Sequence, residues 1–410
     1  MADSPHSNAF NFISYLEHQV DPRTGQYTAS ISIPDINANQ LCGPTLPLSL
    51  TFNPLNRLNQ GFGPGWSWQL SQYEINTQLL TLSTGETLKV VNWDGPKAIF
   101  SEQKLINFNF YRESPVSYRI AHNSGLTEIL ELQSARAMPV RHYSPQGHDL
   151  SLTYEPWDDD SKPVDVLSGV YDAQKQVLFK VHDIGSTTLK LELYPNLVDY
   201  NSTYLWNYVP GSLESTITLP TEDKAQWRFG YSMVRDCFCI SEVYTPNGAR
   251  ETIVYGDEGH GHPADPTLRL PRVTEHTISP GSDQPDIVTH YSYVLTQASN
   301  NHNFLGYQGA GIVWSENGLD NLYNVFGEYN YGSIQKIIQG SKTTITIERT
   351  YNRFHLLTQE LTRQNDNVCV VNTQYHLLPD RNFFRAAPQL SNPPYHQQIV
   401  VLGLRQEYSA

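Results

Sequence analysis

Short runs of alternating apolar and polar residues recur along the chain and predict β-strands. Thr188–Tyr194 reads Thr-Leu-Lys-Leu-Glu-Leu-Tyr, and Ser30–Pro34, Leu46–Phe52 and Thr343–Tyr351 alternate in the same way. Successive side chains of a strand point to opposite faces, so a period of two places one apolar face toward a core. Stretches with the apolar spacing of an amphipathic helix are few. The pattern therefore predicts an all-β chain.

An internal repeat is the strongest signal. Tyr143–Tyr154 and Tyr244–Tyr255 both read Tyr-x-Pro-x-Gly-x6-Tyr, with their glycines at Gly147 and Gly248. Proline sets φ at the first central turn position, and glycine accepts the left-handed conformation that closes a short hairpin with a bulge. The odd spacing from glycine to tyrosine fixes the face that the aromatic ring occupies. Both segments are therefore predicted to be copies of one hairpin.

Weaker copies of this hairpin surround the two clear ones. Leu80–Val90 is expected to turn at Gly85, whereas Tyr171-Asp172 and Tyr351-Asn352 begin similar units without the glycine. A single hairpin cannot bury its own face, but stacked copies can. We therefore expect the important residues to be structural, namely the turn glycines Gly85, Gly147 and Gly248 and the repeat aromatics Tyr143, Tyr154, Tyr171, Tyr244, Tyr255, Tyr351 and Tyr375.

The order of these motifs resembles the RHS/YD-repeat family. Gly61–Trp68 reads Gly-Phe-Gly-Pro-Gly-Trp-Ser-Trp and is followed by Leu79–Gly85, which looks like the start of an RHS shell. Upstream, Val20–Ile33 resembles the strand pair that precedes this segment, and Tyr351–Thr358 is similar to a YD repeat. The resemblance spans about residues 18 to 378, with degenerate repeats in its second half.

The resemblance implies β-hairpins in a continuous spiralling antiparallel sheet that forms part of a hollow shell. It assigns residues 1–60 to an N-terminal cap or plug-like region with the initial strands, and residues 61–410 to the repeat shell. Such shells occur in polymorphic toxins, type VI effectors and Tc toxin B and C components, where they enclose a toxic C-terminal domain. The implied function is a non-catalytic shell component that encapsulates or chaperones a toxic polypeptide.

The end of the sequence departs from the family pattern. Family shells commonly end in an Asp-Pro-x-Gly-Leu motif at which the chain cleaves itself, whereas Val400–Ala410 lacks this motif. We therefore expect the N-terminal part of a shell, a split component or a truncated form. The expected partner is the toxin cargo or the remaining part of the shell, on the same or another chain.

Charge and composition narrow the possible environments. The 410 residues include 27 basic and 41 acidic side chains, for a net charge of −14, which disfavours nucleic acid and anionic membranes as partners. No apolar run is long enough for a membrane span, and the N-terminus does not read as a secretory signal. We expect synthesis in the bacterial cytoplasm and secretion by a route that needs no signal peptide.

Chemistry-bearing motifs are sparse, so the chain is predicted not to be an enzyme and no cofactor is expected. Nucleotide-binding, zinc-protease and nucleophile-elbow motifs are missing from the sequence. Asp257, His260 and His262 are weak candidates for a metal site, and a solvated polar loop is the favoured interpretation. Cys237 and Cys239 fall on one face of a predicted strand and are interpreted as buried thiols rather than zinc ligands.

The aromatic content leaves a second function open. Tyrosine and tryptophan offer flat apolar faces on which sugars stack, but they also hold neighbouring strands in register. Recurrence at repeat positions favours the structural role. The alternative function is a cell-surface carbohydrate-binding or adhesion module with a glycan as its partner.

Overall fold

The computed structural model describes residues 19–56, 59–101, 103, 106–134, 136–159, 162–261, 269–295, 330–340, 343–352, 354–375 and 396–404. Within these ranges every regular element is a β-strand, which confirms the predicted all-β class. The same ranges contain no helix of the length and apolarity that crossing a membrane requires.

The N-terminal strands form a small antiparallel sheet in the order β1-β2-β3-β4. The apolar residues of the predicted alternation face one side, and Ile31 of β2 pairs with Leu50 of β3. The period-two pattern therefore located these strands from the sequence. Their bounds are β1 Gln19–Val20, β2 Tyr27–Asn37, β3 Thr45–Phe52 and β4 Trp66–Trp68.

The next strands form the first turn of a much larger sheet. Each pairs antiparallel with the strand before it, and the sheet meets its own beginning where Arg136 and Ala137 of β12 pair with Glu74 and Tyr73 of β5. The bounds are β5 Gln72–Glu74, β6 Leu79–Thr81, β7 Thr87–Asp94, β8 Lys97–Phe100, β9 Phe108–Arg112, β10 Ser117–His122, β11 Thr127–Leu132 and β12 Arg136–Tyr143.

This first turn has a core of its own. Eight strands enclose a space just wide enough for side chains to fill. Tyr73, Phe110 and Tyr118 pack there with ring centroids 4.8 to 5.6 Å apart. Leu80, Val90, Ile120 and Leu130 complete the buried set together with other apolar residues of these strands.

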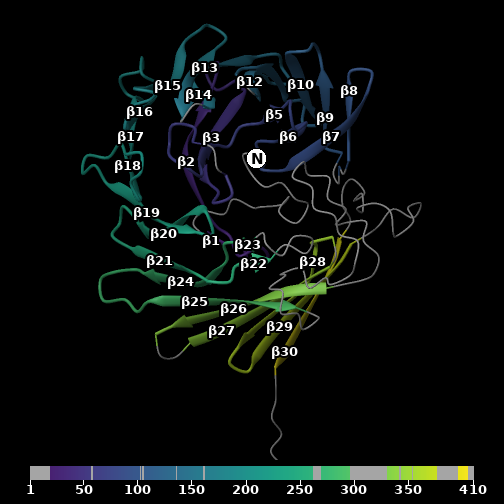
Figure 1. Cartoon of the computed structure of the whole chain (residues 1–410), viewed down its shortest axis with the longest axis vertical. Helices are drawn as coiled ribbons and strands as arrows, with labels where there is room; N and C mark the ends of the chain where they lie inside the picture. Colours follow the sequence, from purple (N-terminus) through teal and green to yellow (C-terminus); the bar gives the residue numbers. More distant parts are fainter. Residues whose placement is uncertain are drawn as a thin grey trace, which may run out of the picture.

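From β12 the same sheet continues as a long curved wall. The second half of β12 pairs with β13, and antiparallel pairing then runs from strand to strand to β30. Figure 1 shows the teal strands β13 to β20 curving round β2 and β3, with β24 to β30 fanning out beyond them. The predicted continuous antiparallel sheet is therefore confirmed, and the structure closes it into a barrel-like shell.

The wall strands have the following bounds, with β22 and β23 forming a separate pair. They are β13 Asp149–Asp159, β14 Lys162–Asp172, β15 Val177–His182, β16 Thr188–Leu193, β17 Ser202–Tyr208, β18 Glu214–Thr218, β19 Gln226–Val234, β20 Cys237–Tyr244, β21 Arg250–Tyr255, β22 His260–Gly261, β23 Arg269–Leu270, β24 Val273–Ser279, β25 Ile287–Leu295, β26 Asn330–Gln339, β27 Thr343–Asn352, β28 Leu357–Gln364, β29 Asn367–Tyr375 and β30 His396–Leu404.

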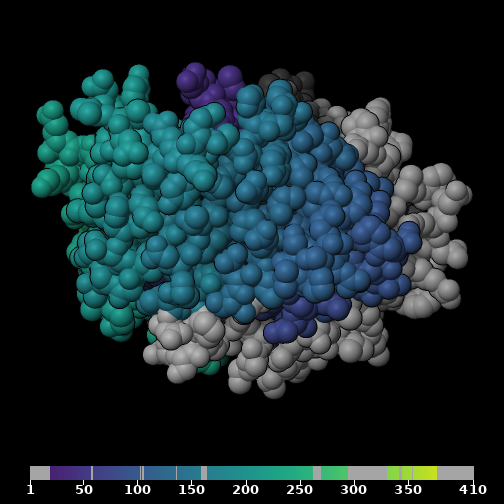
Figure 2. Space-filling model, turned by 90° about the horizontal axis from the view of Figure 1, so that it is seen from above, coloured from purple at the N-terminus to yellow at the C-terminus, as the bar shows by residue number. Residues whose placement is uncertain are grey.

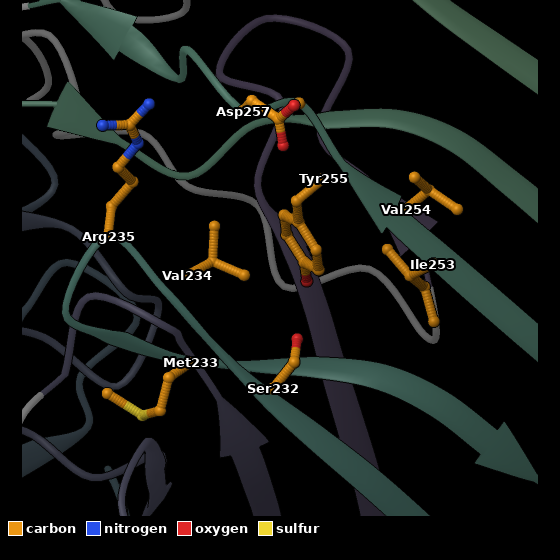
Figure 3. A pocket seen from close by; sticks show the side chains of 9 residues that line it. Ser232, Met233, Val234, Arg235, Ile253, Val254, Tyr255 and Asp257 are labelled. Atoms are coloured by element: carbon orange, nitrogen blue, oxygen red, sulfur yellow. The ribbon is translucent and has the colours of Figure 1, made fainter.

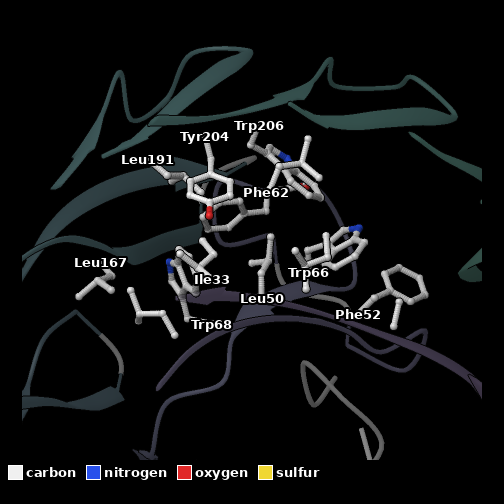
Figure 4. Packing of buried hydrophobic residues seen from close by; sticks show 14 of the residues in the cluster. Ile33, Leu50, Phe52, Phe62, Trp66, Trp68, Leu167, Leu191, Tyr204 and Trp206 are labelled. Carbon is white, nitrogen blue, oxygen red and sulfur yellow. Dashed lines mark hydrogen bonds between the residues drawn. The ribbon is translucent and has the colours of Figure 1, made fainter. Parts of the chain in front are cut away.

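The inner face of the wall packs against the N-terminal sheet. Trp66 packs against Trp206, with ring centroids 5.0 Å apart (Figure 4). The ring of Phe229 lies 4.9 Å from that of Trp66 and 6.4 Å from that of Trp206, so the three rings form one cluster. The indole of Trp206 donates a hydrogen bond of 3.1 Å to the carbonyl of Phe62. Along β13 to β25, apolar side chains of β1 to β4 pack against this inner face.

The outside of the wall is a continuous surface on the face that Figure 2 shows. The blue to green part of the chain covers this face, and purple N-terminal residues emerge only at its margin. The change from the N-terminal sheet to the large sheet falls between Trp68 and Gln72. The predicted domain boundary after residue 60 stays a prediction.

We expect Gly147→Val and Gly248→Val each to lower the free energy of unfolding by about 1 kcal/mol or more, because a β-branched residue strains positive φ. The φ angles are 87° and 88°, and a Cβ at either site would have no atom within 4 Å, so the cost is purely conformational. Thermal unfolding measures it. Gly147→Asn is the matched control and should cost less, because asparagine tolerates this conformation. Unchanged melting temperatures in both valine variants would contradict the prediction.

Candidate functional site

The predicted turn glycines close one recurring turn. Gly147 donates its amide to the carbonyl of Ser144 at 2.9 Å, and Ser144 donates to the carbonyl of His148 at 2.8 Å. Gly85 and Gly248 occupy the same position with φ of 88°. The same pair of hydrogen bonds closes Leu82–Glu86, His122–Leu126, Asp172–Gln176, Thr245–Ala249 and Asn352–Leu356.

Two of these turns lack glycine and are stabilised instead by hydrogen bonds to the side chain of an aspartate or an asparagine. Lys175 and His355 take the left-handed position with φ of 63° and 65°. Asp172 Oδ1 accepts hydrogen bonds of 2.9 and 2.8 Å from the amides two and four residues later. Asn352 Oδ1 accepts the equivalent pair at 3.0 and 3.1 Å. Asp172 and Asn352, which follow Tyr171 and Tyr351, therefore stabilise by side-chain hydrogen bonds a turn conformation that glycine adopts readily in the other copies.

The second tyrosine of each clear repeat caps a β-bulge. A bulge adds one residue to a strand and disrupts the ladder locally, so backbone groups there need other partners. The register of β11 and β12 shifts at Pro139, whose carbonyl accepts a 2.8 Å hydrogen bond from the hydroxyl of Tyr154. Ile240 and Tyr255 form the same contact at 2.8 Å. Two further bulges are capped likewise, Val273 by Tyr293 at 3.1 Å and Leu357 by Tyr375 at 3.0 Å.

The capping tyrosines differ from the first tyrosine of each repeat. Burial raises the pKa of Tyr154 and of Tyr255 well above the usual value, so their hydroxyls stay protonated and donate. Tyr143 is half-buried and accepts a 3.3 Å hydrogen bond from Arg141. Tyr244 is also half-buried and lies 3.8 Å from the guanidinium carbon of Arg228, measured to the ring centroid.

The remaining repeat aromatics also cover backbone or other rings. Tyr171 lies over Gly169, where an added Cβ would be 2.9 Å from the tyrosine hydroxyl. Tyr351 stacks on Tyr331 with centroids 5.4 Å apart, and burial raises the pKa of Tyr351 to about 12. The structure thus places the predicted aromatics at strand contacts along the wall and does not gather them into one pocket.

The weak metal candidates do not share one environment. Asp257 is exposed, whereas His260 on β22 is fully buried with its ring edge-on to Tyr293, 4.5 Å away. The expectation of a solvated loop is therefore wrong for His260, because β22 pairs with β23 and Tyr293 of β25 packs against the imidazole ring. His262 lies outside the described residues. In the part of the chain that the structure describes, no group of three His, Cys, Asp or Glu side chains is arranged to hold a metal ion.

A buried ionisable cluster escaped the sequence analysis. Glu128 on β11 lies 2.7 Å from His122 and 3.6 Å from His142, which are on β10 and β12. Burial works to raise the pKa of Glu128, but the hydrogen bond with His122 and the neighbouring imidazoles outweigh it and hold that pKa below its usual value. Burial lowers the pKa of His142. The three residues come from neighbouring strands, and no local motif marks them.

No family model and no curated protein matches the sequence. Among solved structures, the chain is similar to the Photorhabdus luminescens Tc holotoxin pore, at 9% identity over 95% of this chain and 26% of that one, with a TM-score of 0.38. It is also similar to a TcdB2-TccC3-Cdc42 structure, at 9% identity over 85% and 26%, with a TM-score of 0.34.

A third similarity is to the N-terminal domain of the effector SpvB from Salmonella typhimurium, at 12% identity over 52% of this chain and 98% of that one, with a TM-score of 0.28. The chain spans about a quarter of the two Tc chains, 26% in each case. All three TM-scores are low, so the similarities by themselves decide no function.

Tyr154→Phe and Tyr255→Phe should each lower the free energy of unfolding by about 1–2 kcal/mol, because each leaves a buried bulge carbonyl without its donor. Urea denaturation measures the change. Tyr143→Phe and Tyr244→Phe are matched controls from the same repeats and should stay within about 0.5 kcal/mol of the parent. Equal losses in both classes of variant would show that the hydroxyl contact to the bulge is unimportant.

The free energy of unfolding should decrease in two steps as the pH is lowered. Because the pKa of His142 is lower in the folded chain than in the unfolded chain, the unfolded chain takes up a proton first as the pH falls. The stability that neutral His142 contributes is therefore complete above about pH 6.5 and declines below it. The lowered pKa of Glu128 adds a loss below about pH 4.5. Urea denaturation at several pH values tests this. His142→Gln should flatten the slope between about pH 7 and 5; a slope parallel to that of the parent chain would refute the assignment.

Proposed function

We propose that this chain is a non-catalytic wall segment of an RHS/YD-repeat shell that encloses or chaperones a toxic polypeptide. The observation that carries the proposal is the uninterrupted antiparallel sheet from β5 to β30, whose concave side buries another segment of polypeptide. The repeat motifs of the sequence support the same assignment. The structural similarities are too distant to add to it.

The two faces of the wall differ in the way that containment requires. On β16, Leu189, Leu191 and Leu193 are buried against the N-terminal strands. Lys190 and Glu192 alternate with them and form an ion pair of 3.2 Å on the other face. The chain's net charge of −14 favours solubility of such a wall. An apolar inner face then separates its contents from solvent.

The described ionisable groups with shifted pKa values support a non-catalytic role. Tyr154 and Tyr255 are engaged at bulges, and Glu128 and His142 join neighbouring strands. Perturbed groups of a catalytic site usually lie in a cleft that a substrate can enter, whereas Glu128 and His142 are buried between strands of the sheet. They hold strands together, which is what a wall needs.

The family resemblance supplies the biological setting of the proposal. The toxic cargo, or the rest of the shell, belongs to the same chain or to a partner chain. The protein is made in the bacterial cytoplasm and secreted by a route that needs no signal peptide.

The alternative function, a glycan-binding or adhesion module, has less support. Sugar platforms need exposed aromatic faces. Trp66, Trp68 and Trp206 are buried, and the other described tryptophans are half-buried. Tyr200, with 70% of its surface exposed, is the best platform candidate among the described residues.

The test is co-expression with the polypeptide encoded immediately downstream in the genome. We expect the two to co-purify and the cargo to resist a protease that digests it when it is expressed alone. Cargo digested at the same rate with and without the wall would contradict the proposal. Glycan-array binding that disappears in Tyr200→Ala would favour the alternative.

A further inference from the structure

Three strand pairs of the wall separate in the same way. β12 and β13, β20 and β21, and β24 and β25 pair over only three or four residues before they diverge. In each case the first strand carries a bulge at the point of divergence, and a tyrosine hydroxyl from the second strand reaches the bulge carbonyl. Each divergence leaves a stretch of strand edge that its neighbour does not cover.

Other backbone segments occupy two of these edges. Arg136 and Ala137 of β12 pair antiparallel with β5. Val273 of β24 donates its amide to the carbonyl of Gly25 at 2.9 Å. The wall therefore uses this kind of edge to hold extended chain from elsewhere in the sequence, with backbone hydrogen bonds as the means.

The equivalent edge of β20 has no such strand among the described residues. By their distance from the repeat tyrosine, Phe238 corresponds to Ala137 and Ile240 corresponds to Pro139. Ile240 accepts the hydroxyl of Tyr255, so its backbone groups face β21. Strand backbone groups alternate between the two edges, so the amide and carbonyl of Phe238 face the same way.

Independent support for this direction comes from β19. Tyr231, the partner of Ile240, donates its amide to the carbonyl of Leu213, away from β20. Tyr231 and Ile240 are thus a non-hydrogen-bonded pair, and the amide of Ile240 also points to the uncovered edge.

A pocket of about 420 Å³ lies between the end of β19 and the end of β21, the two strands that pair with β20 on either side (Figure 3). Its lining includes the exposed apolar side chains of Met233 and Val254, with 61% and 45% of their surface accessible. Arg235 and Asp257 also line it (Figure 3). Asp236 and Asp257 lie in the loops that follow β19 and β21, and a lysine or arginine on the bound segment can pair with either carboxylate.

We propose that the edge of β20 at Phe238 and Ile240, with the adjoining pocket, is a docking slot for an extended segment of a partner polypeptide. The segment adds antiparallel to β20, as β5 adds to β12, and exchanges backbone hydrogen bonds with Phe238. It places an apolar side chain against Met233 and Val254, next to a lysine or arginine. The slot is defined by the split hairpin alone and does not depend on the proposed shell function.

The probe is a labelled eight-residue peptide of alternating valine and threonine with a lysine at each end. Fluorescence anisotropy with the full chain should show saturable binding, and hydrogen exchange should show new protection at the amides of Phe238 and Ile240. The same peptide with N-methylated backbone amides should bind at least tenfold more weakly, because it keeps its side chains but loses its donors. Absence of binding, or equal binding of both peptides, would overturn the proposal.

Two surface variants locate the site without disturbing the core. Val254→Lys should weaken peptide binding at least tenfold, because it removes an apolar contact and repels the lysines. Val209→Lys is the matched control, since Val209 has a similar exposed fraction of 52% and does not line the pocket. Equal affinities of the two variants would place the peptide elsewhere. A concentration-dependent dimer that protects the Phe238 amide without peptide would assign the slot to a second copy and likewise overturn the proposal.

Discussion

The contact between a tyrosine hydroxyl and a bulge carbonyl is the interaction on which the curvature of this protein depends. A bulge bends a strand and increases its twist, but it leaves backbone groups that the ladder no longer pairs. Tyr154 and Tyr255 supply the missing partner, because each hydroxyl donates a hydrogen bond to the carbonyl at the bulge. Repetition of this unit turns a flat series of hairpins into a wall that curves.

The bulge with its tyrosine also explains where other segments of the chain can pair with the wall. Where strands diverge at a bulge, an edge becomes available, and the structure uses such edges to bind β5 and the turn at Gly25. The N-terminal strands are thereby fixed inside the curve, and their apolar faces complete the core with Trp206 and Phe229. Curvature, closure of the first turn and seating of the N-terminal sheet thus follow from one local irregularity.

Local features of the chain were accessible from the sequence because their causes are local. Alternation located β2, β3 and β16, and proline and glycine marked the turns at Gly147 and Gly248. The turn at Gly125 forms the same hydrogen bonds but carries no such mark in the sequence, because no tyrosine and proline precede the glycine. The similar turns at Lys175 and His355 depend on a preceding Asp or Asn, which is a weaker sequence signal.

By itself the sequence determined the all-β class, the repeated hairpin and the tyrosine positions, since strand periodicity and turn chemistry act over a few residues. Only the tertiary structure decided that β12 meets β5, that Glu128 lies between His122 and His142, and that His260 is buried. These contacts join segments whose separation along the chain carries no period or motif. They arise because the twist and the bulges of many successive strands together bring distant strand edges into contact. No short stretch of sequence specifies this combined curvature.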